Sequence, residues 1–206
     1  MLIYAASMQA RPGRSRDVAE HVTRLRHITA DATGEKVWAW RSVGAGPFGG
    51  FGMSMRFDGT ADLIKMQQTI GEDEKFQAAA QDLAPHLLAP AQITVNQVIG
   101  ATQEGEPKAF ATITTATMTS HLTRALTWAQ GTLESVTRHT GLTGVLCQPT
   151  SGRVFELSWI FAADSPEEMD TASEKLAVNE EYLHRLDETD GLFIEGSVNR
   201  FLLAQL

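Results

Sequence analysis

Apolar side chains in the first half of the chain recur at two different spacings. Alternation at every second residue predicts four strands, over residues 2–10, 36–43, 51–57 and 92–99. Apolar residues three and four positions apart predict a helix that is capped by Ser15 or Asp17 and ends at Gly34. A broken helical stretch follows, with apolar residues from Leu63 to Leu87. The first half therefore has the predicted order β-α-β-β-α-β.

The second half repeats this order. Its strands are predicted over residues 109–118, 142–148, 154–161 and 193–203. One helix is predicted to end at Gly141, and a second helical stretch begins at the cap Ser165, with Pro166 as its first residue. Between the halves, residues 101–107 lack large apolar side chains and include Gly105 and Pro107, so they predict a linker. We therefore expect two units, over residues 1–100 and 108–206, joined by the linker 101–107.

A single βαββαβ unit forms a four-stranded antiparallel sheet with both helices on one face. Its second face must also be covered, and a tandem copy can cover it. The sequence thus predicts an α+β fold, in which two fused ferredoxin-like units pack their sheets into a pseudo-dimeric α+β barrel. The expected alignment of the copies places residues 51–57 over 155–161 and Phe76 opposite Tyr182.

The chain resembles the dimeric α+β barrel superfamily, especially the antibiotic-biosynthesis monooxygenases and the NIPSNAP-like proteins. The resemblance is carried by the opening strand, the turn Arg11-Pro12-Gly13-Arg14 before the first helix, and the small-residue hairpin loop 44–50. It covers both halves in outline, although the second half has Thr119-Ser120 in place of the Pro-Gly turn. The resemblance implies a cavity between the sheet and the helices of each unit. Members include cofactor-independent monooxygenases, polyketide cyclases, isomerases, haem enzymes and proteins without known activity.

Composition and charge exclude several classes of function. The 206 residues carry a net charge of −8, which is opposite to that of a general phosphate-backbone binder, so we expect no nucleic-acid partner. Residues 1–100 hold ten basic and ten acidic side chains, whereas residues 101–206 hold seven and fifteen. No apolar run approaches the ~20 residues that a membrane span needs, so no membrane partner is expected. A single cysteine, Cys147, and a poor match of the first residues to a signal peptide favour a cytoplasmic protein.

The six histidines do not form a metal-binding pattern. No two of them are four residues apart on a predicted helix, and no cluster of cysteines or carboxylates accompanies them, so we expect no metal and no cofactor. Haem binding is a further alternative, because His184 is placed on a helix where some related haem enzymes carry their ligand. His184, however, is predicted to lie at the solvent edge of its helix.

The candidate site lies in the first half, where aromatic and methionine side chains gather. Trp38 and Trp40 share one face of their strand, as Met53 and Met55 do on the next. If those faces meet the helices, these four side chains and Phe76 would surround a space that suits a flat aromatic ligand, although plain core packing is the alternative. Candidate catalytic residues complete the hypothesis, with His21 or His86 as the proton acceptor and Arg41 as the anion stabiliser.

Two classes of function remain open at this point. The first is an enzyme that acts on a hydrophobic small molecule, aromatic or of polyketide type, as a cofactor-independent monooxygenase or as a cyclase or isomerase. The second is a non-catalytic module of the same fold that binds a ligand or supports an assembly. A homodimer of the fused unit is compatible with both. An empty space with a polar group at its end would favour the enzyme, and a solid core would favour the module.

Overall fold

The structure is a computed structural model that describes residues 1–43, 49–103 and 105–206. Eight strands of these described residues are hydrogen-bonded in the order β1-β3-β2-β8-β5-β7-β6-β4, which closes on itself as an antiparallel barrel. The described part of the chain also contains six α-helices, so the fold class is α+β, as the sequence predicts. The chain divides into two compact units, described separately below. Unit 1 comprises Met1–Gln97 with Leu203–Leu206, and unit 2 comprises Val98–Leu202.

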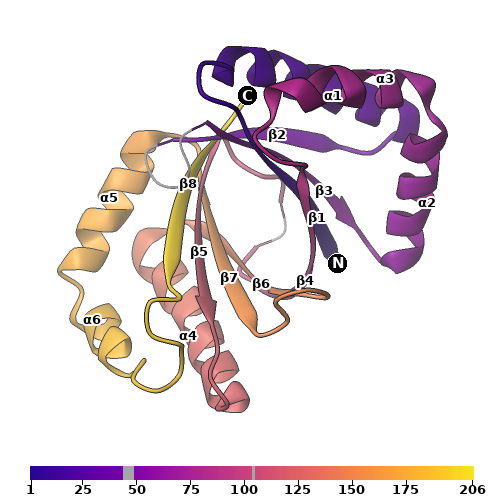
Figure 1. Ribbon diagram of the computed structural model, residues 1–206. Coiled ribbons are helices and arrows are strands. Elements are labelled where there is room, and N and C mark those ends of the chain that lie inside the picture. The colour runs from indigo at the N-terminus through magenta and orange to yellow at the C-terminus, as the bar shows by residue number, and fades with distance from the viewer. Residues whose placement is uncertain (44–48, 104) are drawn as a thin grey trace. The chain divides into compact units, whose positions relative to one another are not determined.

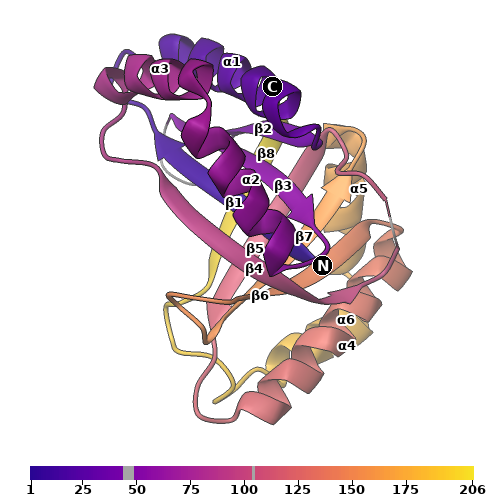
Figure 2. The ribbon, with the colours of Figure 1, turned by 90° about the vertical axis from the view of Figure 1, so that its right-hand side faces the viewer.

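Unit 1 follows the expected β-α-β-β-α-β order. Its elements are β1 (Leu2–Gln9), α1 (Ser15–Thr33), β2 (Val37–Ser42), β3 (Gly50–Phe57), α2 (Thr60–Glu72), α3 (Glu74–Leu83), the short 3₁₀ turn η1 (Ala84–His86) and β4 (Gln92–Ala101), whose last four residues belong to unit 2. The helices cover one face of the sheet, with α1 packed on β2 and β3 (Figure 1). Figure 2 shows α1 and α3 side by side, and the two helices are in contact.

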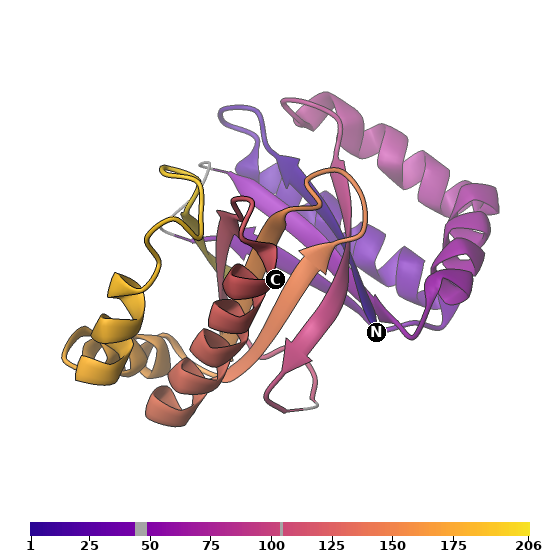
Figure 3. The ribbon, with the colours of Figure 1, turned by 90° about the horizontal axis from the view of Figure 1, so that it is seen from below.

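Unit 2 repeats the same elements. They are β5 (Phe110–Thr117), α4 (Leu122–Thr140), β6 (Thr143–Pro149), β7 (Glu156–Ala163), α5 (Pro166–Ala177), α6 (Glu180–Asp187) and β8 (Asn199–Gln205), of which residues 203–205 belong to unit 1. Helix α4 packs on β6, and both α5 and α6 pack on α4 (Figure 3).

Alternate residues of the third strand of each unit face the helices. In β3, Phe51, Met53, Met55 and Phe57 are buried, whereas the residues between them are only partly buried. They join the core that α1 completes with its stripe of Val18, Val22 and Leu25. The strand β7 shows the same alternation, and Leu157, Trp159, Phe161 and Ala163 enter the core of unit 2. This confirms the predicted direction of the apolar rows.

The two long helices end in the same way. Gly34 after α1 and Gly141 after α4 both adopt the left-handed conformation, with φ of 73° and 82°. In each case the last helical residue is a threonine, Thr33 or Thr140, whose hydroxyl donates to a carbonyl in the preceding turn and accepts from a backbone N–H two residues on. The duplicated ending fixes α1 and α4 as corresponding helices, with a constant offset of residue numbers.

Several predicted details differ from the structure. The start of α1 has no side-chain cap, because the residue before the helix is Arg14, and Ser15 and Asp17 lie inside its first turn. The last strand begins at Asn199 instead of at residue 193, because Gly196, with φ of 73°, turns the chain just before it. Ser165 caps α5 as predicted and accepts from Glu168 N at 3.2 Å.

The alignment of the two copies also needs correction at the third strand. Strand pairing matches Leu2 with Phe57 in unit 1, and Phe110 with Ala163 in unit 2. Phe57 therefore corresponds to Ala163, two residues beyond its predicted counterpart Phe161. A shift of two residues keeps every side chain on its face, so the predicted facing survives. The pairing of Phe76 with Tyr182 is confirmed, because each is the third residue of a helix and donates its N–H to the capping side chain, Asp73 or Asn179.

The compact units also divide the chain at positions other than the predicted ones. Residues 98–101 belong to unit 2 as the end of β4, and residues 203–206 return to unit 1. Backbone pairing explains this return, because Leu203, Ala204 and Gln205 pair with residues of β2. Leu206 continues the contact through its N–H, which donates to Ala39 O at 3.0 Å. The chain end is thus part of the sheet of unit 1.

Two glycine substitutions test the packing of the units. A Cβ on Gly144 would lie 2.7 Å from both Leu133 Cδ1 and Phe161 Cε1, so Gly144→Ala overpacks the core of unit 2 and should lower the free energy of unfolding by about 1–3 kcal/mol. Gly71 lies in α2 with no atom within 4 Å of such a Cβ, so Gly71→Ala should raise that free energy by about 0.5–1 kcal/mol. Urea unfolding of the two variants measures both values. Equal effects would contradict this description of the core.

Candidate functional site

The two predicted catalytic histidines lie side by side in unit 1. His21 is on α1, and His86 is the last residue of η1. Their ring centroids are 5.1 Å apart, and the rings are tilted by 37°. Residues 65 positions apart in the sequence are thus brought together at one end of the unit.

Backbone contacts hold η1 beside the end of β1. Arg11 N donates to His86 O at 2.9 Å, and Leu88 N donates to Gln9 O at 2.8 Å. The side chain of Arg11 adds a third bond, from Nε to Leu87 O at 2.8 Å. His86 is therefore positioned by the main chain on both sides, which fixes where its imidazole can lie.

Asp17, which lies on α1 with His21, contacts His86. Its Oδ2 lies 3.3 Å from His86 Nδ1, a buried atom, without the alignment of a hydrogen bond, and the two side chains form an ion pair only when His86 is protonated. Arg14 Nη1 donates to the same oxygen at 3.0 Å. The hydrogen bond from Arg14 holds the pKa of Asp17 below its usual value, and the charges of Arg14, His86 and His21 add to this effect. Asp17 is therefore a carboxylate over the neutral pH range, and it faces His86 Nδ1.

This arrangement can take up a proton. With Nδ1 directed at Asp17, the other ring nitrogen of His86, Nε2, has no hydrogen-bond partner in the part of the chain that the structure describes. The side chain is 24% exposed, so a small molecule can reach it. A carboxylate beside one imidazole nitrogen orients the ring and stabilises the imidazolium that forms when the other nitrogen accepts a proton. His86 is the candidate base. The sequence predicts a role for Asp17 only as a helix cap. Its spacing of four residues from His21 was the signal that could have placed Asp17 beside the histidine pair.

The corresponding positions of unit 2 hold a different set of side chains. The matching helix ends place Trp128 where unit 1 has His21. Strand pairing places Trp159, between Thr114 and Leu146, where unit 1 has Met53 between Ala6 and Ala39. The isolated bridges from Ala10 to Leu87 and from Met118 to Phe193 are equivalent, so Phe193 stands where unit 1 has Leu87. Leu192 replaces His86, since Thr119 N bonds to its carbonyl as Arg11 N bonds to that of His86.

The three aromatic side chains of unit 2 fill this place by packing edge to face. Trp128 and Trp159 have centroids 6.0 Å apart, Trp128 and Phe193 5.4 Å, and Trp159 and Phe193 5.9 Å. Both indole N–H groups are used, by Arg185 O at 2.8 Å and by Ala129 O at 3.0 Å. At these three positions unit 2 therefore packs aromatic rings, whereas unit 1 has a histidine, a methionine and a leucine.

The predicted binding set does not share one face. The register of β2 against β3 pairs Trp38 with Ser54 and Trp40 with Gly52, whereas Met53 and Met55 pair with Ala39 and Val37. Both tryptophans consequently lie on the face turned away from the helices, and the expectation that they line one space with the methionines is wrong. The reason is the register between β2 and β3. One strand would have to shift by a single residue to bring the tryptophans to the face of the methionines.

The two tryptophans have polar neighbours on their own face. Trp40 Nε1 donates to Ser54 Oγ at 2.9 Å, and Arg56 Cζ lies 5.7 Å from the ring centroid of Trp38. Met55 and Phe76 belong to the core on the helix side, where Met55 is 2% exposed. Arg41, the predicted anion stabiliser, is an exposed residue of β2 that pairs with Phe51 and Ala204. The structure does not bring Arg41 to the histidine pair through any contact of the described residues.

Two further features of unit 2 are relevant to ligand binding. A groove of about 640 Å³ runs along α4, with Leu126, Gln130 and Glu134 on one side and Ile99, Leu146 and Gln148 on the other. The side chain of Gln130 lies over Gly100 within this groove, and no histidine lines it. His184, the candidate haem ligand, is 78% exposed and 3.7 Å from Glu188.

The described residues include no group of three or more His, Cys, Asp or Glu side chains that could hold a metal ion. Among the same residues, no helix is long and apolar enough to cross a membrane.

Comparison with solved structures identifies the fold. A candidate monooxygenase from Fusobacterium nucleatum matches all of this chain and 92% of its own, with a TM-score of 0.74 at 7% identity. An anthrone oxidase-like protein matches all of this chain and 91% of its own, with a TM-score of 0.70 at 13% identity. This chain shares the α+β barrel fold of these structures. Neither a protein-family model nor a curated protein matches its sequence.

The α+β barrel fold is compatible with more than one activity. A protein described as a major regulator of staphylococcal pathogenesis also matches this whole chain and 99% of its own, with a TM-score of 0.60 at 10% identity. At such identities the likeness concerns the fold, and function must be argued from the site.

The ion pair of Asp17 gives a measurable pH effect. Because the folded pKa of Asp17 lies below its unfolded value, its contribution to stability is present above the unfolded pKa and is lost as the pH falls through the folded pKa. Arg14→Gln removes the largest cause, so the pKa of Asp17, followed by carboxyl ¹³C NMR, should rise towards its ordinary value. Arg16→Gln is the control, since Arg16 pairs with Glu20 instead. An unchanged Asp17 pKa in Arg14→Gln would contradict this assignment.

Proposed function

We propose that unit 1 binds a hydrophobic aromatic molecule beside His21, Met53 and Leu87, and that His86 removes a proton from it. Proton removal is the first step of cofactor-independent oxygenation, and cyclisation or isomerisation of a similar molecule can begin with the same step. Two neighbours of the same fold, from Fusobacterium nucleatum and Lactobacillus acidophilus, are described as candidate monooxygenases, and a third is described as anthrone oxidase-like. These descriptions support the reaction class and not the substrate.

The observation that carries the proposal is the difference between the two units at the same four positions. In unit 2, Trp128, Trp159 and Phe193 pack against one another, and Leu192 provides no ionisable group. In unit 1 smaller side chains occupy the three aromatic positions, and the fourth is a histidine in contact with a carboxylate. A duplicated core that needed only to be filled would have no use for this contact between a histidine and a carboxylate. We infer that an aromatic ligand takes the place of the missing rings.

Each residue has a defined role in this proposal. His86 accepts the proton at Nε2, and Asp17 stabilises the imidazolium through Nδ1. Arg14 keeps Asp17 ionised, and is thus a positioning residue. The ring centroid of His21 lies 5.1 Å from that of His86. His21 is thus beside the base and can donate a hydrogen bond to the oxygen of the ligand on which negative charge develops.

Anthrone is a suitable probe because its CH₂ group loses a proton to give an aromatic anion. The anion transfers electrons to O₂ and forms a C–O bond, and the resulting hydroperoxide loses water to give the quinone. One anthrone and one O₂ thus yield one anthraquinone and one H₂O, so the carbon is oxidised, dioxygen is reduced, and no other reductant is consumed. The protein supplies the base, the alignment and the exclusion of water.

A non-catalytic ligand-binding module is the second candidate, and one observation favours it. Met53 and Leu87 are only 9% and 7% exposed, so side chains already close much of the place beside His21. In that case the protein would bind an aromatic molecule without consuming oxygen. Binding and turnover must therefore be measured separately.

The first test addresses catalysis. With anthrone and dissolved O₂, we expect the protein to accelerate formation of anthraquinone, followed by absorbance and by oxygen uptake. His86→Gln removes the base and should lower the rate by about 10²–10⁴, whereas His27→Gln, on the exposed side of α1, should leave it unchanged. Anthrone binding without oxygen uptake would select the non-catalytic module, and equal activity of His86→Gln would refute the assigned base.

The second test addresses the place of binding by copying unit 2 into unit 1. Met53→Trp, alone and with His21→Trp, inserts the rings that corresponding positions of unit 2 accommodate. We expect anthrone binding, measured by equilibrium dialysis, to weaken at least about tenfold while circular dichroism shows an intact fold. Trp40→Phe, on the opposite face of the sheet, is the matched control and should bind normally. If Met53→Trp binds as well as the unmodified protein, the ligand lies elsewhere.

A further inference from the structure

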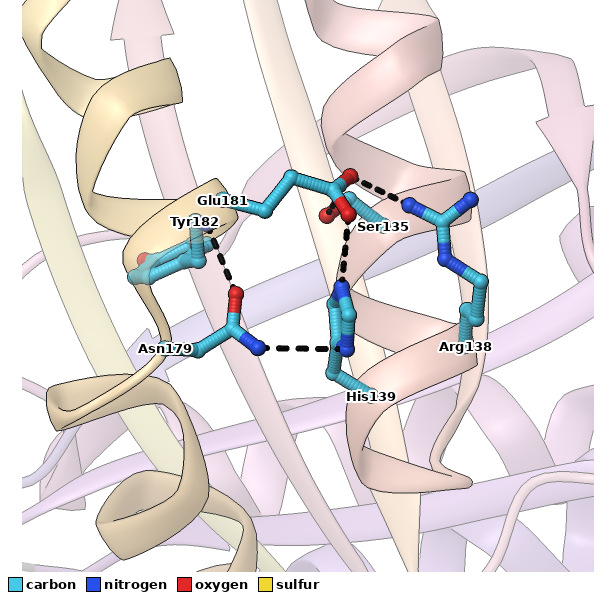
Figure 4. A network of polar contacts seen from close by, with 6 residues as sticks. All are labelled: Ser135, Arg138, His139, Asn179, Glu181 and Tyr182. Atoms are coloured by element: carbon cyan, nitrogen blue, oxygen red, sulfur yellow. Dashed lines mark hydrogen bonds and ion pairs between the residues drawn. The ribbon is translucent and has the colours of Figure 1, made fainter.

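A second histidine cluster joins α4 to the start of α6 in unit 2. Figure 4 shows Ser135, Arg138 and His139 on α4 facing Asn179, Glu181 and Tyr182 at the start of α6. Glu181 accepts from Ser135 Oγ at 3.2 Å and forms an ion pair with Arg138. Its second oxygen, Oε2, lies 3.1 Å from His139 Nε2.

The amide of Asn179 can be oriented without ambiguity. Asn179 is the capping residue of α6, and its side-chain oxygen accepts from Tyr182 N at 2.8 Å. A backbone N–H can donate only to the oxygen of the amide, so the NH₂ group must be the part that faces His139 Nδ1 at 3.2 Å.

This orientation fixes the protonation state of His139. Because the NH₂ group donates, His139 Nδ1 must accept and cannot carry a proton. The ring proton is therefore on Nε2, from which it donates to Glu181. Both ring nitrogens are occupied, so this cluster has no free lone pair for proton abstraction, in contrast to His86.

Protonation of His139 would place two donors against each other. The imidazolium carries N–H at Nδ1 as well, facing the NH₂ group of Asn179. Rotation of the amide would satisfy His139 but would turn NH₂ towards the N–H of Tyr182, and the cap of α6 would be lost. The contact with Glu181, in contrast, becomes stronger when His139 is charged.

The charged groups around His139 are few. Arg138 is its neighbour on α4, and Glu181 faces it from α6. The hydrogen bond from His139 and the charge of Arg138 lower the pKa of Glu181, so the carboxylate persists as the pH falls. Helix α5, which also packs on α4, contributes no ion pair or hydrogen bond to this cluster among the described residues.

We infer that His139 is a pH-sensitive switch for the first turn of α6: its protonation releases the Asn179 cap while Glu181 keeps the helix attached to α4. Unit 1 lacks the switch. Its corresponding cap, Asp73, accepts from Phe76 N at 2.7 Å, and Ala32 stands at the position of His139.

Amide hydrogen exchange of the whole protein tests the switch. We expect the protection factor of the Tyr182 amide, corrected for intrinsic exchange, to fall about fivefold as the pH is lowered from about 8 to about 5. The Phe76 amide of unit 1 is the internal control and should keep its protection. Equal loss at both amides would indicate general acid destabilisation and would overturn the proposal, as would constant protection of Tyr182.

Two variants separate the switch from ordinary fraying. In Asn179→Asp a carboxylate can accept from both Tyr182 N–H and the imidazolium, so the Tyr182 amide should become better protected as the pH falls. In His139→Ala the cap remains and the pH response should disappear. If either variant loses Tyr182 protection on acidification as the unmodified protein does, His139 is not the titrating group.

Discussion

The register between neighbouring strands determines which side chains can form a site in this protein. Side chains of a strand alternate between two faces, so each pairing assigns a whole row to the helices or to the opposite face. The pairing of β2 with β3 sends Met53 and Met55 to the helices and Trp40 away from them. The proposed binding place of unit 1 depends on that assignment, because it includes Met53.

Duplication allows one copy to serve as a reference for the other. The two long helices end alike, the caps Asp73 and Asn179 bind corresponding N–H groups, and the third strands pair in the same way. Because these features correspond, the positions at which the two units have different side chains are informative. Unit 2 packs aromatic rings at the positions of His21, Met53 and Leu87, and it has Leu192 in place of the His86 that contacts Asp17 in unit 1. We interpret unit 2 as the copy that is more fully packed at these four positions, and unit 1 as the copy that has ionisable groups there.

The two histidine clusters show how similar residues come to differ in chemistry. His139 has a partner at each nitrogen, Glu181 at one and Asn179 at the other, so a proton gained there must disturb a structural contact. His86 has a carboxylate beside one nitrogen only. The first arrangement suits a structural response to pH, and the second suits proton transfer to a ligand. Residue type alone does not distinguish the two.

The sequence by itself determined the local and periodic features of this protein. Apolar spacing gave the order of elements, the duplication, the helix end at Gly34 and the facing of the Met53 row, because these depend on periods of 2.0 and 3.6 residues and on glycine geometry. Only the tertiary structure decided that His21 meets His86, that Asp17 contacts His86, and that Trp40 faces away from Met53. These relations depend on how β2 pairs with β3 and on where η1 returns to β1, and such long-range pairings leave no periodic pattern in the sequence.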